Sequence, residues 1–148
     1  MENPFISIII VNWNDKERTV NAVKSLLEST YQNFEIIVAD NNSEDESREA
    51  LAEIDKVKVV NTGGNLGFGP ASNVGYEHSI KKDFIFICAN DSEIESDCIE
   101  KLVKAAKENP ECGIFSPVEY ELSDKETIQQ FGCKIDFFGF PYGLTHTR

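Results

Sequence analysis

Five short apolar runs recur along the chain, separated by longer polar stretches. The first run is continuous and rich in isoleucine, which is typical of a strand buried on both faces of a parallel sheet. The other runs are of strand length and rich in β-branched and aromatic residues. The sequence therefore predicts strands at Phe5–Val11, Phe34–Ala39, Val57–Val60, Asp83–Cys88 and Ile114–Tyr120.

The stretches between these runs carry helix signals. Asn14 with Glu17, and Ser43 with Glu46, match the spacing of a capping box, in which the first side chain accepts a hydrogen bond from the helix N-terminus. Proline at position 70 suits the first turn of a helix. We therefore predict helices from Asn14, from Ser43 to about Ile54, from Pro70 to Ile80 and from Ser96 to about Asn109.

This alternation of strands and helices predicts an α/β fold, with a mostly parallel sheet and helices on both faces. The periodicity weakens after Tyr120, and the Phe- and Gly-rich stretch Phe131–Leu144 favours irregular or hairpin structure. We expect one α/β domain over residues 1–120 and an irregular continuation over residues 121–148.

Composition narrows the class of protein. Hydrophobic residues make up 41% of the 148-residue chain, enough for a globular core. The formal net charge of −12 argues against a nucleic-acid-binding protein, which usually presents a basic face. The apolar run Phe5–Val11 is too short for a secretory signal or a membrane span. We therefore expect a cytoplasmic protein, with peripheral association at the inner face of a membrane left open.

Asn and Asp residues gather where the predicted strands end. In parallel sheets, ligands bind outside the carboxyl ends of the strands. A single such residue is explained by a turn or a helix cap, but the group taken together favours a ligand site. The segments are Asn12-Trp13-Asn14, Asp40-Asn41-Asn42, Thr62–Gly69 and Asn90-Asp91.

The glycine-rich loop in this group fits neither of two common phosphate-binding motifs. A GxGxxG motif starting at Gly67 needs glycine where Ser72 stands, and a P-loop ending at Gly69 needs lysine where Pro70 stands. Its glycines favour either a close approach of the backbone to a ligand or a sharp turn into the next helix.

Two aspartates in this group carry distinct chemistry. Asp40 can accept hydrogen bonds from a nucleobase imide or a ribose hydroxyl, and an Asx-turn is the alternative. Asp91, with Asn90 and Glu93 nearby, offers an oxygen ligand to Mg²⁺ or Mn²⁺. Such ions share one or two carboxylates with substrate phosphates. One aspartate therefore suffices where a diphosphate supplies the other ligands.

Several segments also match a known family in their order along the chain. They are Ser7–Asn14, Ser25–Leu27 with Thr30-Tyr31, Phe34–Ser43, Asn65–Phe68 with Asn73 and Gly75, and Phe84–Ile87 leading into Asn90–Glu93. This order resembles family 2 glycosyltransferases of the GT-A fold, over about residues 5–120. The Asn-Leu-Gly-Phe segment is similar to the rhamnosyltransferase-like branch of that family.

The resemblance implies a donor site for a nucleotide sugar, with a UDP- or dTDP-sugar as the donor and Mn²⁺ or Mg²⁺ as the cofactor. Asp91 would be the metal ligand of the family's DxD motif, which reads Ala89-Asn90-Asp91 here and lacks its first aspartate. The basic residue often found before the position of Asn73 is also replaced, by Ser72. The donor-binding residues implied are Val11, Asn12, Trp13, Asp40, Asn42, Asn65, Gly67, Asn73 and Asn90.

The family transfers its sugar with inversion to an acceptor hydroxyl, which an Asp or Glu well beyond the DxD region deprotonates. Asp124, Glu126 and Asp136 are the late acidic candidates, and none lies in the family's pattern for that base. We therefore expect this chain to lack the general base and the acceptor-binding region. The resemblance points to glycan or cell-surface polysaccharide synthesis with a glycan or lipid-linked acceptor, and it leaves a homo-oligomer open.

Two other functions remain open at this point. A nucleotidyltransferase would carry a glycine-rich loop with Arg or Lys directly after the first strand, where this chain has Asn12-Trp13-Asn14-Asp15. A non-catalytic nucleotide-binding or scaffold module would explain both the short length and the incomplete DxD motif.

Overall fold

The computed structural model describes residues 3–81, 83–135 and 141–143. The chain divides into two compact units, Met1–Asp97 and Cys98–Arg148, called here the first and second unit. The domain end expected near residue 120 therefore falls inside the second unit. All the segments expected to form the ligand site belong to the first unit.

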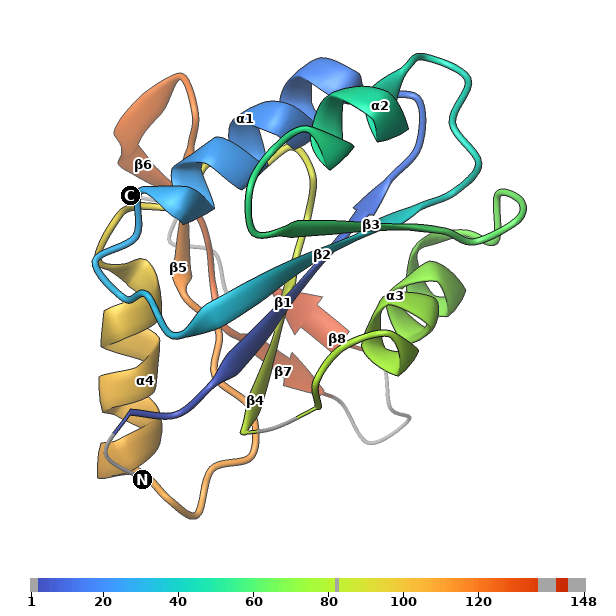
Figure 1. Cartoon of the computed structure of the whole chain (residues 1–148). Helices are drawn as coiled ribbons and strands as arrows, with labels where there is room; N and C mark the ends of the chain where they lie inside the picture. Colours follow the sequence, from blue (N-terminus) through green and yellow to red (C-terminus); the bar gives the residue numbers. More distant parts are fainter. Residues whose placement is uncertain (1–2, 82, 136–140, 144–148) are drawn as a thin grey trace. The chain divides into compact units, whose positions relative to one another are not determined.

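The first unit is built on a parallel sheet of four strands in the order β3-β2-β1-β4 (Figure 1). Each of these strands matches a predicted strand, with ends that differ by one residue. In register, Asn12 lies opposite Asp40, and Ile10 lies opposite Cys88. The strands are β1 (Ile6–Asn12), β2 (Phe34–Asp40), β3 (Val57–Asn61) and β4 (Phe84–Cys88).

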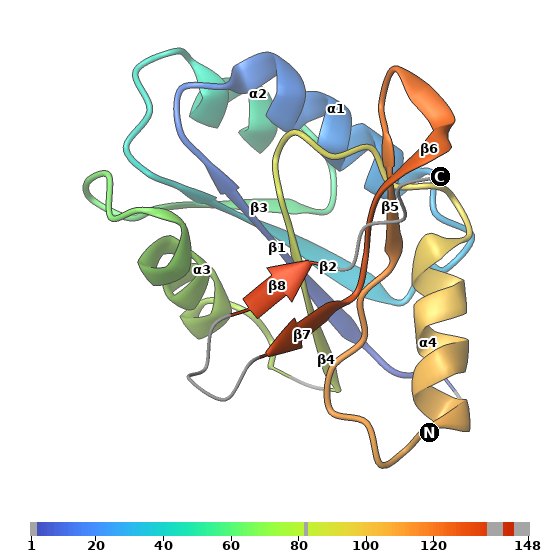
Figure 2. The same cartoon turned by 180° about the vertical axis from the view of Figure 1, so that it is seen from behind.

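Three helices cover this sheet: α1 (Lys16–Leu27), α2 (Ser47–Ala52) and α3 (Phe68–Glu77). Right-handed connections run outward from β1 to β2 and β3, and the chain then returns past β1 to reach β4. This reversal puts α1 and α2 on one face of the sheet and α3 on the other, as Figures 1 and 2 show. The predicted α/β fold with helices on both faces is confirmed.

Alternation along β1 and β2 decides which side chains meet which helix. Val11 and Ala39 pack with Ala71 of α3 in one buried cluster. Gly75 brings α3 so close to the sheet that a Cβ there would lie 2.6 Å from Ile9 Cγ2. The opposite face carries Asn12 and Asp40, register partners that are 0% exposed under α1 and α2.

Both capping-box predictions are wrong. Asn14 has a left-handed φ of 50°, and its side chain accepts a hydrogen bond from the Glu44 amide at 2.8 Å. Ser43 is hydrogen-bonded to Asp40 and Asn14, and it caps no helix. The helices begin instead at Lys16 and Ser47, so the second also ends earlier than predicted, at Ala52.

One side chain, Asp45, bonds to the first residue of both helices. Its Oδ2 accepts from the Lys16 amide at 2.9 Å, and its Oδ1 accepts from the Ser47 amide at 3.2 Å. The free N–H groups of a helix start are stabilised by such an acceptor. Asp45 therefore ties the starts of α1 and α2 to one carboxylate.

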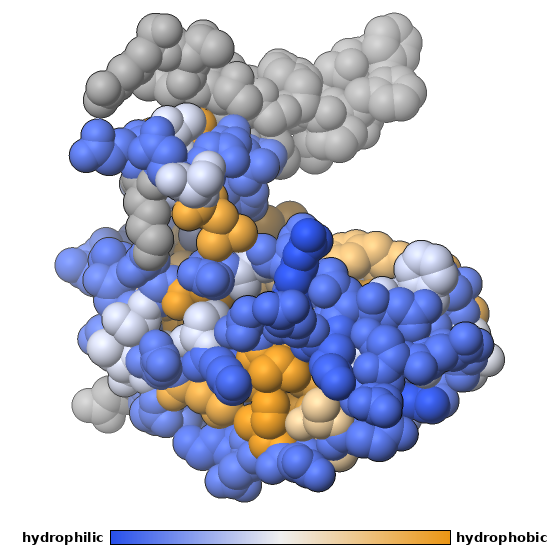
Figure 3. All heavy atoms as spheres, turned by 90° about the horizontal axis from the view of Figure 1, so that it is seen from above, coloured by the Kyte–Doolittle hydropathy of each residue, from blue (hydrophilic) through white to orange (hydrophobic). Residues whose placement is uncertain are grey.

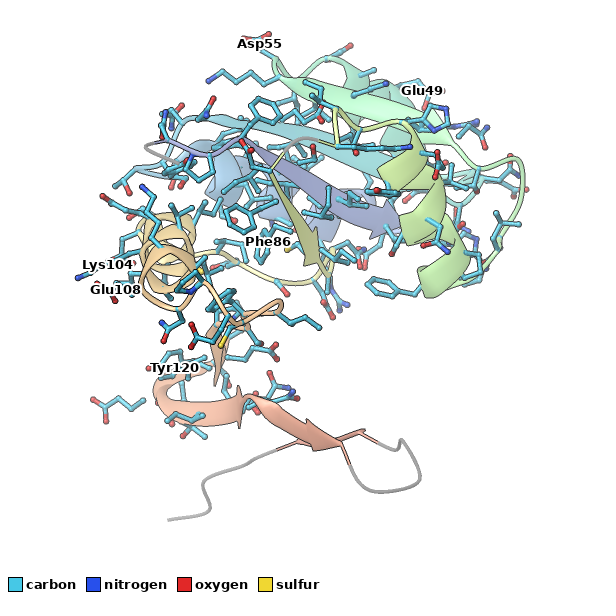
Figure 4. All side chains as sticks on the ribbon, turned by 90° about the horizontal axis from the view of Figure 1, so that it is seen from below. Glu49, Asp55, Phe86, Lys104, Glu108 and Tyr120 are labelled. Carbon is cyan, nitrogen blue, oxygen red and sulfur yellow. The ribbon has the colours of Figure 1, made fainter. Side chains whose placement is uncertain are left out.

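The second unit contains one helix and two antiparallel strand pairs among its described residues. Lys104 and Glu108 project side by side from α4, with 3.9 Å between Nζ and Oε1 (Figure 4). Ile99 and Val103 of this helix are buried. The elements are α4 (Cys98–Glu108), β5 (Val118–Glu121), β6 (Asp124–Phe131), β7 (Cys133–Ile135) and β8 (Pro141–Gly143).

The prediction of a fifth strand at Ile114–Tyr120 is wrong in extent. The strand β5 starts only after Pro117, which has no N–H to donate to a ladder. It pairs antiparallel with β6 and is not part of the parallel sheet. The continuation after residue 120 is also more regular than expected, since β6 alone has eight residues. The predicted hairpin is present as β7 with β8, while residues 136–140 and 144–148 lie outside the described residues.

One face of the molecule is mostly hydrophilic. Figure 3 looks down from above the view of Figure 1 and shows mostly hydrophilic residues, with apolar ones gathered in smaller patches. None of the helices in the described part of the chain is both long and apolar enough to cross a membrane.

Candidate functional site

The site lies at the carboxyl edge of the parallel sheet, where the strand order reverses. From β1 the chain first runs outward to β2 and β3, and it later returns to the other side of β1 as β4. Such a reversal leaves a crevice outside the carboxyl ends of the two neighbouring strands, and ligands bind there in open α/β sheets. Trp13 follows β1 and Asn90-Asp91 follow β4, so these segments flank the reversal.

A buried hydrogen-bond network joins the ends of β1 and β2. Asn12 Nδ2 donates to Asp40 Oδ1 at 2.7 Å and lies 3.0 Å from Ser43 Oγ. The Ser43 hydroxyl donates to Asp40 Oδ1 at 2.6 Å, and the Ser43 amide donates to Asp40 Oδ2 at 2.9 Å. Both carboxylate oxygens of Asp40 thus have partners inside the protein. The Asp40 side chain bonds to the backbone three residues on, not two as in the Asx-turn considered for it, and it is closed to solvent.

The charge of Asp40 has a cation beside it. Arg48 Nε, on α2, lies 3.7 Å from Asp40 Oδ2, and the Arg48 side chain is 38% exposed. A buried carboxylate is tolerated when it is hydrogen-bonded and paired with a cation. The arrangement therefore explains how an aspartate survives at 0% exposure without contact to any ligand.

Thr19 extends this network to the turn after β4. Its Oγ1 lies 2.7 Å from Asn12 Oδ1 and 2.7 Å from the Asp15 carbonyl, and it accepts from Asn90 Nδ2 at 3.2 Å. Asn90 lies two residues beyond Cys88, the last residue of β4 that pairs with β1. One threonine hydroxyl therefore joins both sides of the strand-order reversal.

Asn41 presents an amide that ligands can use. Its Oδ1 accepts from Thr62 Oγ1 at 3.1 Å and from the Leu66 amide at 3.3 Å. A backbone N–H can only donate, so Oδ1 must face Leu66 and the Nδ2 donors must point elsewhere. The described chain has no buried side-chain N or O atom without a partner, and no acceptor within it bonds to Nδ2. Nδ2 therefore keeps a small exposed area, although Asn41 as a whole is buried at 3% exposure.

The remaining residues expected at the site are spread over the edge. Trp13 is 54% exposed, while Val11 is buried against α3, so only its backbone can face a ligand. Asn65 Oδ1 accepts from the Gly67 amide at 3.1 Å, which shapes the glycine-rich loop as an Asx-turn. Gly67 has a φ of 81°, which favours glycine. Asn42, Asn73 and Asp91 are exposed.

The donor set at Asp91 fits a hard cation only if a ligand completes it. Within the described residues, no three His, Cys, Asp or Glu side chains form a group that could hold a metal ion. Asp91 itself is exposed in the turn and keeps its carboxylate free for a bond. Magnesium-type ions commonly take one or two protein carboxylates and fill the other positions with phosphate oxygens and water. The residues present therefore fit a cation brought together with a diphosphate.

Comparison with known proteins identifies the family. The model of Glycosyl transferase family 2 matches residues 7–143. The chain belongs to this family. The dTDP-rhamnosyl transferase RfbF of Shigella flexneri is 31% identical over 118 residues, which are 78% of this chain and 39% of that protein. The glycosyltransferase GlyG of Streptococcus pneumoniae is 30% identical over 107 residues, which are 70% of this chain and 35% of that protein.

Solved glycosyltransferase structures share the fold of this family 2 chain. The crystal structure of S. aureus TarS 1-349 in complex with UDP-GlcNAc aligns with a TM-score of 0.66 and 20% identity, over 72% of this chain and 32% of that one. The mannosyltransferase PcManGT from Pyrobaculum calidifontis, in complex with GDP-Man and Mn²⁺, aligns with a TM-score of 0.62 and 20% identity, over 70% and 32%. This chain spans less than half the length of the relatives it matches.

Four residues of this family 2 site were missed by the sequence reasoning: Thr19, Asn41, Ser43 and Arg48. Asn41 lay inside the polar segment Asp40-Asn41-Asn42 without a role of its own, and Ser43 was interpreted as a helix cap. Thr19 and Arg48 lie on helices, and nothing in the local sequence shows that the Thr19 hydroxyl and the Arg48 guanidinium face the strand ends. Only the packing of α1 and α2 over the strand ends brings them into the network.

Proposed function

We propose that this chain is the donor-binding part of a glycosyltransferase and holds a nucleotide-diphosphate sugar at the carboxyl edge of its sheet. The observation that carries the proposal is the pair of open residues flanking the strand-order reversal, Trp13 after β1 and Asp91 after β4. They combine an apolar ring with a carboxylate, the two chemistries that a base and a metal-bound diphosphate require.

The geometry divides the expected donor residues into two groups. Trp13 is exposed and Asn41 Nδ2 has no partner within the described residues, so we assign both to the nucleobase: the ring by stacking, and Nδ2 by a hydrogen bond to a base carbonyl. Asn12 and Asp40 are closed to solvent, so we assign them to holding the strand ends in place. Asn42, Asn65, Gly67 and Asn73 keep their proposed role along the donor pocket.

In the metal step, Asp91 would bind Mn²⁺ or Mg²⁺ jointly with the donor. The neighbouring residue, Asn90, would offer its side-chain oxygen beside it. A bound cation of this kind neutralises charge on the diphosphate as it leaves. For transfer with inversion, we place the general base outside this chain, because the matched region covers less than half of each of these relatives. The acceptor is then proposed to be a glycan or a lipid-linked sugar.

The nucleobase is proposed to be uracil or thymine. Both offer base carbonyls to the Asn41 amide, and the name of the RfbF relative specifies a dTDP sugar. The family match disfavours a nucleotidyltransferase. The non-catalytic module stays as the competing function, and it predicts that no nucleotide binds.

Calorimetric titration of UDP, dTDP and GDP, each with and without Mn²⁺, tests this proposal. We expect UDP or dTDP to bind more tightly with Mn²⁺, and Asp91→Ala to remove the Mn²⁺-dependent gain. Glu93→Ala is the matched control, since it removes an equally exposed carboxylate two residues away and should keep the gain. Absence of binding by all three nucleotides would favour the non-catalytic module, and preference for GDP would contradict the base assignment.

A further inference from the structure

The turn that carries Asp91 begins where the sheet ends. Ile10 with Cys88 is the last register pair between β1 and β4, so no strand partner supports the chain from Ala89 onward. Within the turn, the Ser92 amide donates to the Ala89 carbonyl at 3.4 Å, which is long for such a bond. The orientation of the Asp91 carboxylate must therefore depend on contacts outside the sheet.

Hydroxyl groups of α1 and of the connection after it supply these contacts. Side-chain hydroxyls meet the segment after β4 at successive points along its length. Thr19 accepts from Asn90 Nδ2 at 3.2 Å, Ser25 accepts from the Ile94 amide at 3.0 Å, and Ser29 and Thr30 each lie 3.2 Å from the Ser96 carbonyl that they bond to. Only the first of these bonds reaches the turn itself.

Thr19 differs from the other hydroxyls because it is also part of the buried network. It is 0% exposed, and Asn12, its neighbour at 2.7 Å, donates in turn to Asp40. The single Thr19 oxygen thus connects the turn after β4 to the rigid ends of β1 and β2. Asn90 adjoins Asp91, so holding the Asn90 side chain restricts the backbone from which the Asp91 carboxylate projects.

We propose that Thr19 is a positioning residue for Asp91, acting through the side chain of Asn90. This inference rests on the proposed function, because the cation is what makes the position of Asp91 matter to the donor. Without the Thr19 hydroxyl, the turn spends a smaller fraction of time in the orientation that binds the cation. The apparent affinity of a ligand falls in proportion to that fraction.

Titration of UDP and dTDP with and without Mn²⁺ tests the proposal on the full chain. Thr19→Val keeps the shape of the side chain and removes the hydroxyl, whereas Thr19→Ser keeps the hydroxyl. We expect Thr19→Val to reduce the Mn²⁺-dependent gain in nucleotide affinity about 10-fold, as seen for outer-shell partners of metal ligands. The nucleotide affinity of Thr19→Val without Mn²⁺ should stay within about twofold of wild type, since the position of Asp91 affects only the metal-dependent part of binding. Thr19→Ser should behave as wild type.

Two further variants make the test specific. Asn90→Ala removes the other end of the bond to the turn, so it should lose the Mn²⁺-dependent gain as Thr19→Val does. In the double variant that gain should fall no further, because each single variant already lacks the bond between residues 19 and 90. Asn90→Ala also tests the proposal if Thr19→Val does not fold. Ser25→Ala removes the neighbouring hydroxyl, which contacts Ile94 and not the turn, and should retain the Mn²⁺-dependent gain. An unchanged gain in Thr19→Val, equal losses with and without Mn²⁺, or an equal loss in Ser25→Ala would overturn the proposal.

A readout without nucleotide separates this inference from the proposed function. Amide hydrogen exchange of Ser92, whose N–H bonds within the turn, should be faster in Thr19→Val and in Asn90→Ala than in wild type and in Thr19→Ser. If wild type shows no Mn²⁺-dependent nucleotide binding, the proposed function fails while faster exchange still supports the positioning of the turn. Unchanged Ser92 exchange in both variants overturns the positioning itself.

Discussion

At the scale of single residues, Asp40 shows how a buried carboxylate is satisfied by partners within the protein. Ser43 supplies two of its hydrogen bonds, one from the hydroxyl and one from the backbone amide. The same hydroxyl also accepts from the Asn14 amide at 2.9 Å. Removing it leaves the charged group and a backbone N–H with one partner fewer, in a place that is 3% exposed.

We expect Ser43→Ala to lower the free energy of unfolding of the first unit by about 1–3 kcal/mol, the range for leaving a buried polar group unsatisfied. Urea unfolding followed by the fluorescence of Trp13, the single tryptophan of the sequence, measures this. Ser79→Ala is the matched control, because its hydroxyl bonds only to the local Tyr76 carbonyl near the end of α3. Equal small losses in both variants would show that the network adds little stability.

At the scale of elements, the starts of α1 and α2 depend on one side chain. Asp45 accepts from the first amide of each helix, so Asp45→Ala removes two caps at once. Single caps contribute about 0.5–2 kcal/mol, and we expect a loss of about 1–3 kcal/mol in urea unfolding. Asp55→Ala, on an exposed turn of the same unit (Figure 4), should change stability by less than about 0.5 kcal/mol. A loss in Asp45→Ala no larger than in this control would contradict the shared cap.

The same carboxylate predicts a dependence on pH. Burial alone would raise the pKa of Asp45, but hydrogen bonds from Ser47 and from the Lys16 amide outweigh it and hold the pKa below its ordinary value of 3.8. The native state then binds its proton at lower pH than the unfolded state does, so the stabilisation is present above pH 3.8 and is lost as the pH falls toward the native pKa. The difference in unfolding free energy between wild type and Asp45→Asn should therefore shrink in that range. If the difference in unfolding free energy between wild type and Asp45→Asn stays constant as the pH falls through this range, the prediction is wrong.

Packing of α3 on β1 depends on Gly75. A Cβ at this position would lie 2.6 Å from Ile9 Cγ2, so Gly75→Ala must push the helix away from the sheet. We expect a loss of about 1–3 kcal/mol, the usual cost of overpacking a core. Gly69→Ala, in the first turn of the same helix, meets nothing within 4 Å and should be neutral or up to about 1 kcal/mol more stable. If the two variants unfold at the same urea concentration, the close approach of α3 is not a constraint.

These elements also show which parts of the fold can be predicted from sequence. The strands β1 to β4 were predicted to within one residue at their ends, because an apolar run of strand length is a local signal. The helix caps were mispredicted because the acceptor for the start of α1 comes from Asp45, about thirty residues later in the chain. The fifth strand was mispredicted because β5 pairs antiparallel with β6 and does not join the parallel sheet. Contacts distant in sequence decided both outcomes.

At the scale of the whole molecule, the candidate site could be predicted only in outline. Strand-end Asn and Asp residues pointed to the carboxyl edge of the sheet, and that edge does hold them together. The sequence could not distinguish buried Asp40 from exposed Asp91, since both follow apolar runs of the same kind. The difference arises because α1 and α2 cover the face of β1 and β2 that carries Asn12 and Asp40, whereas the turn after β4 projects beyond the sheet.

The location of Trp13 at this edge makes it a reporter of both binding and unfolding of the first unit. A ligand that binds only the folded state stabilises it by about 2.7 kcal/mol at a concentration 100 times its Kd. With UDP or dTDP and Mn²⁺ at that level, we expect a change in Trp13 fluorescence and a rise of this size in the unfolding free energy. In Asp91→Ala at the same concentrations, the rise should fall to the value that nucleotide gives without Mn²⁺. Because Trp13 and Asp91 follow the carboxyl ends of β1 and β4, a ligand that joins them must lie outside those strand ends. Calorimetric binding with no change at Trp13 would therefore place the nucleotide elsewhere on the molecule.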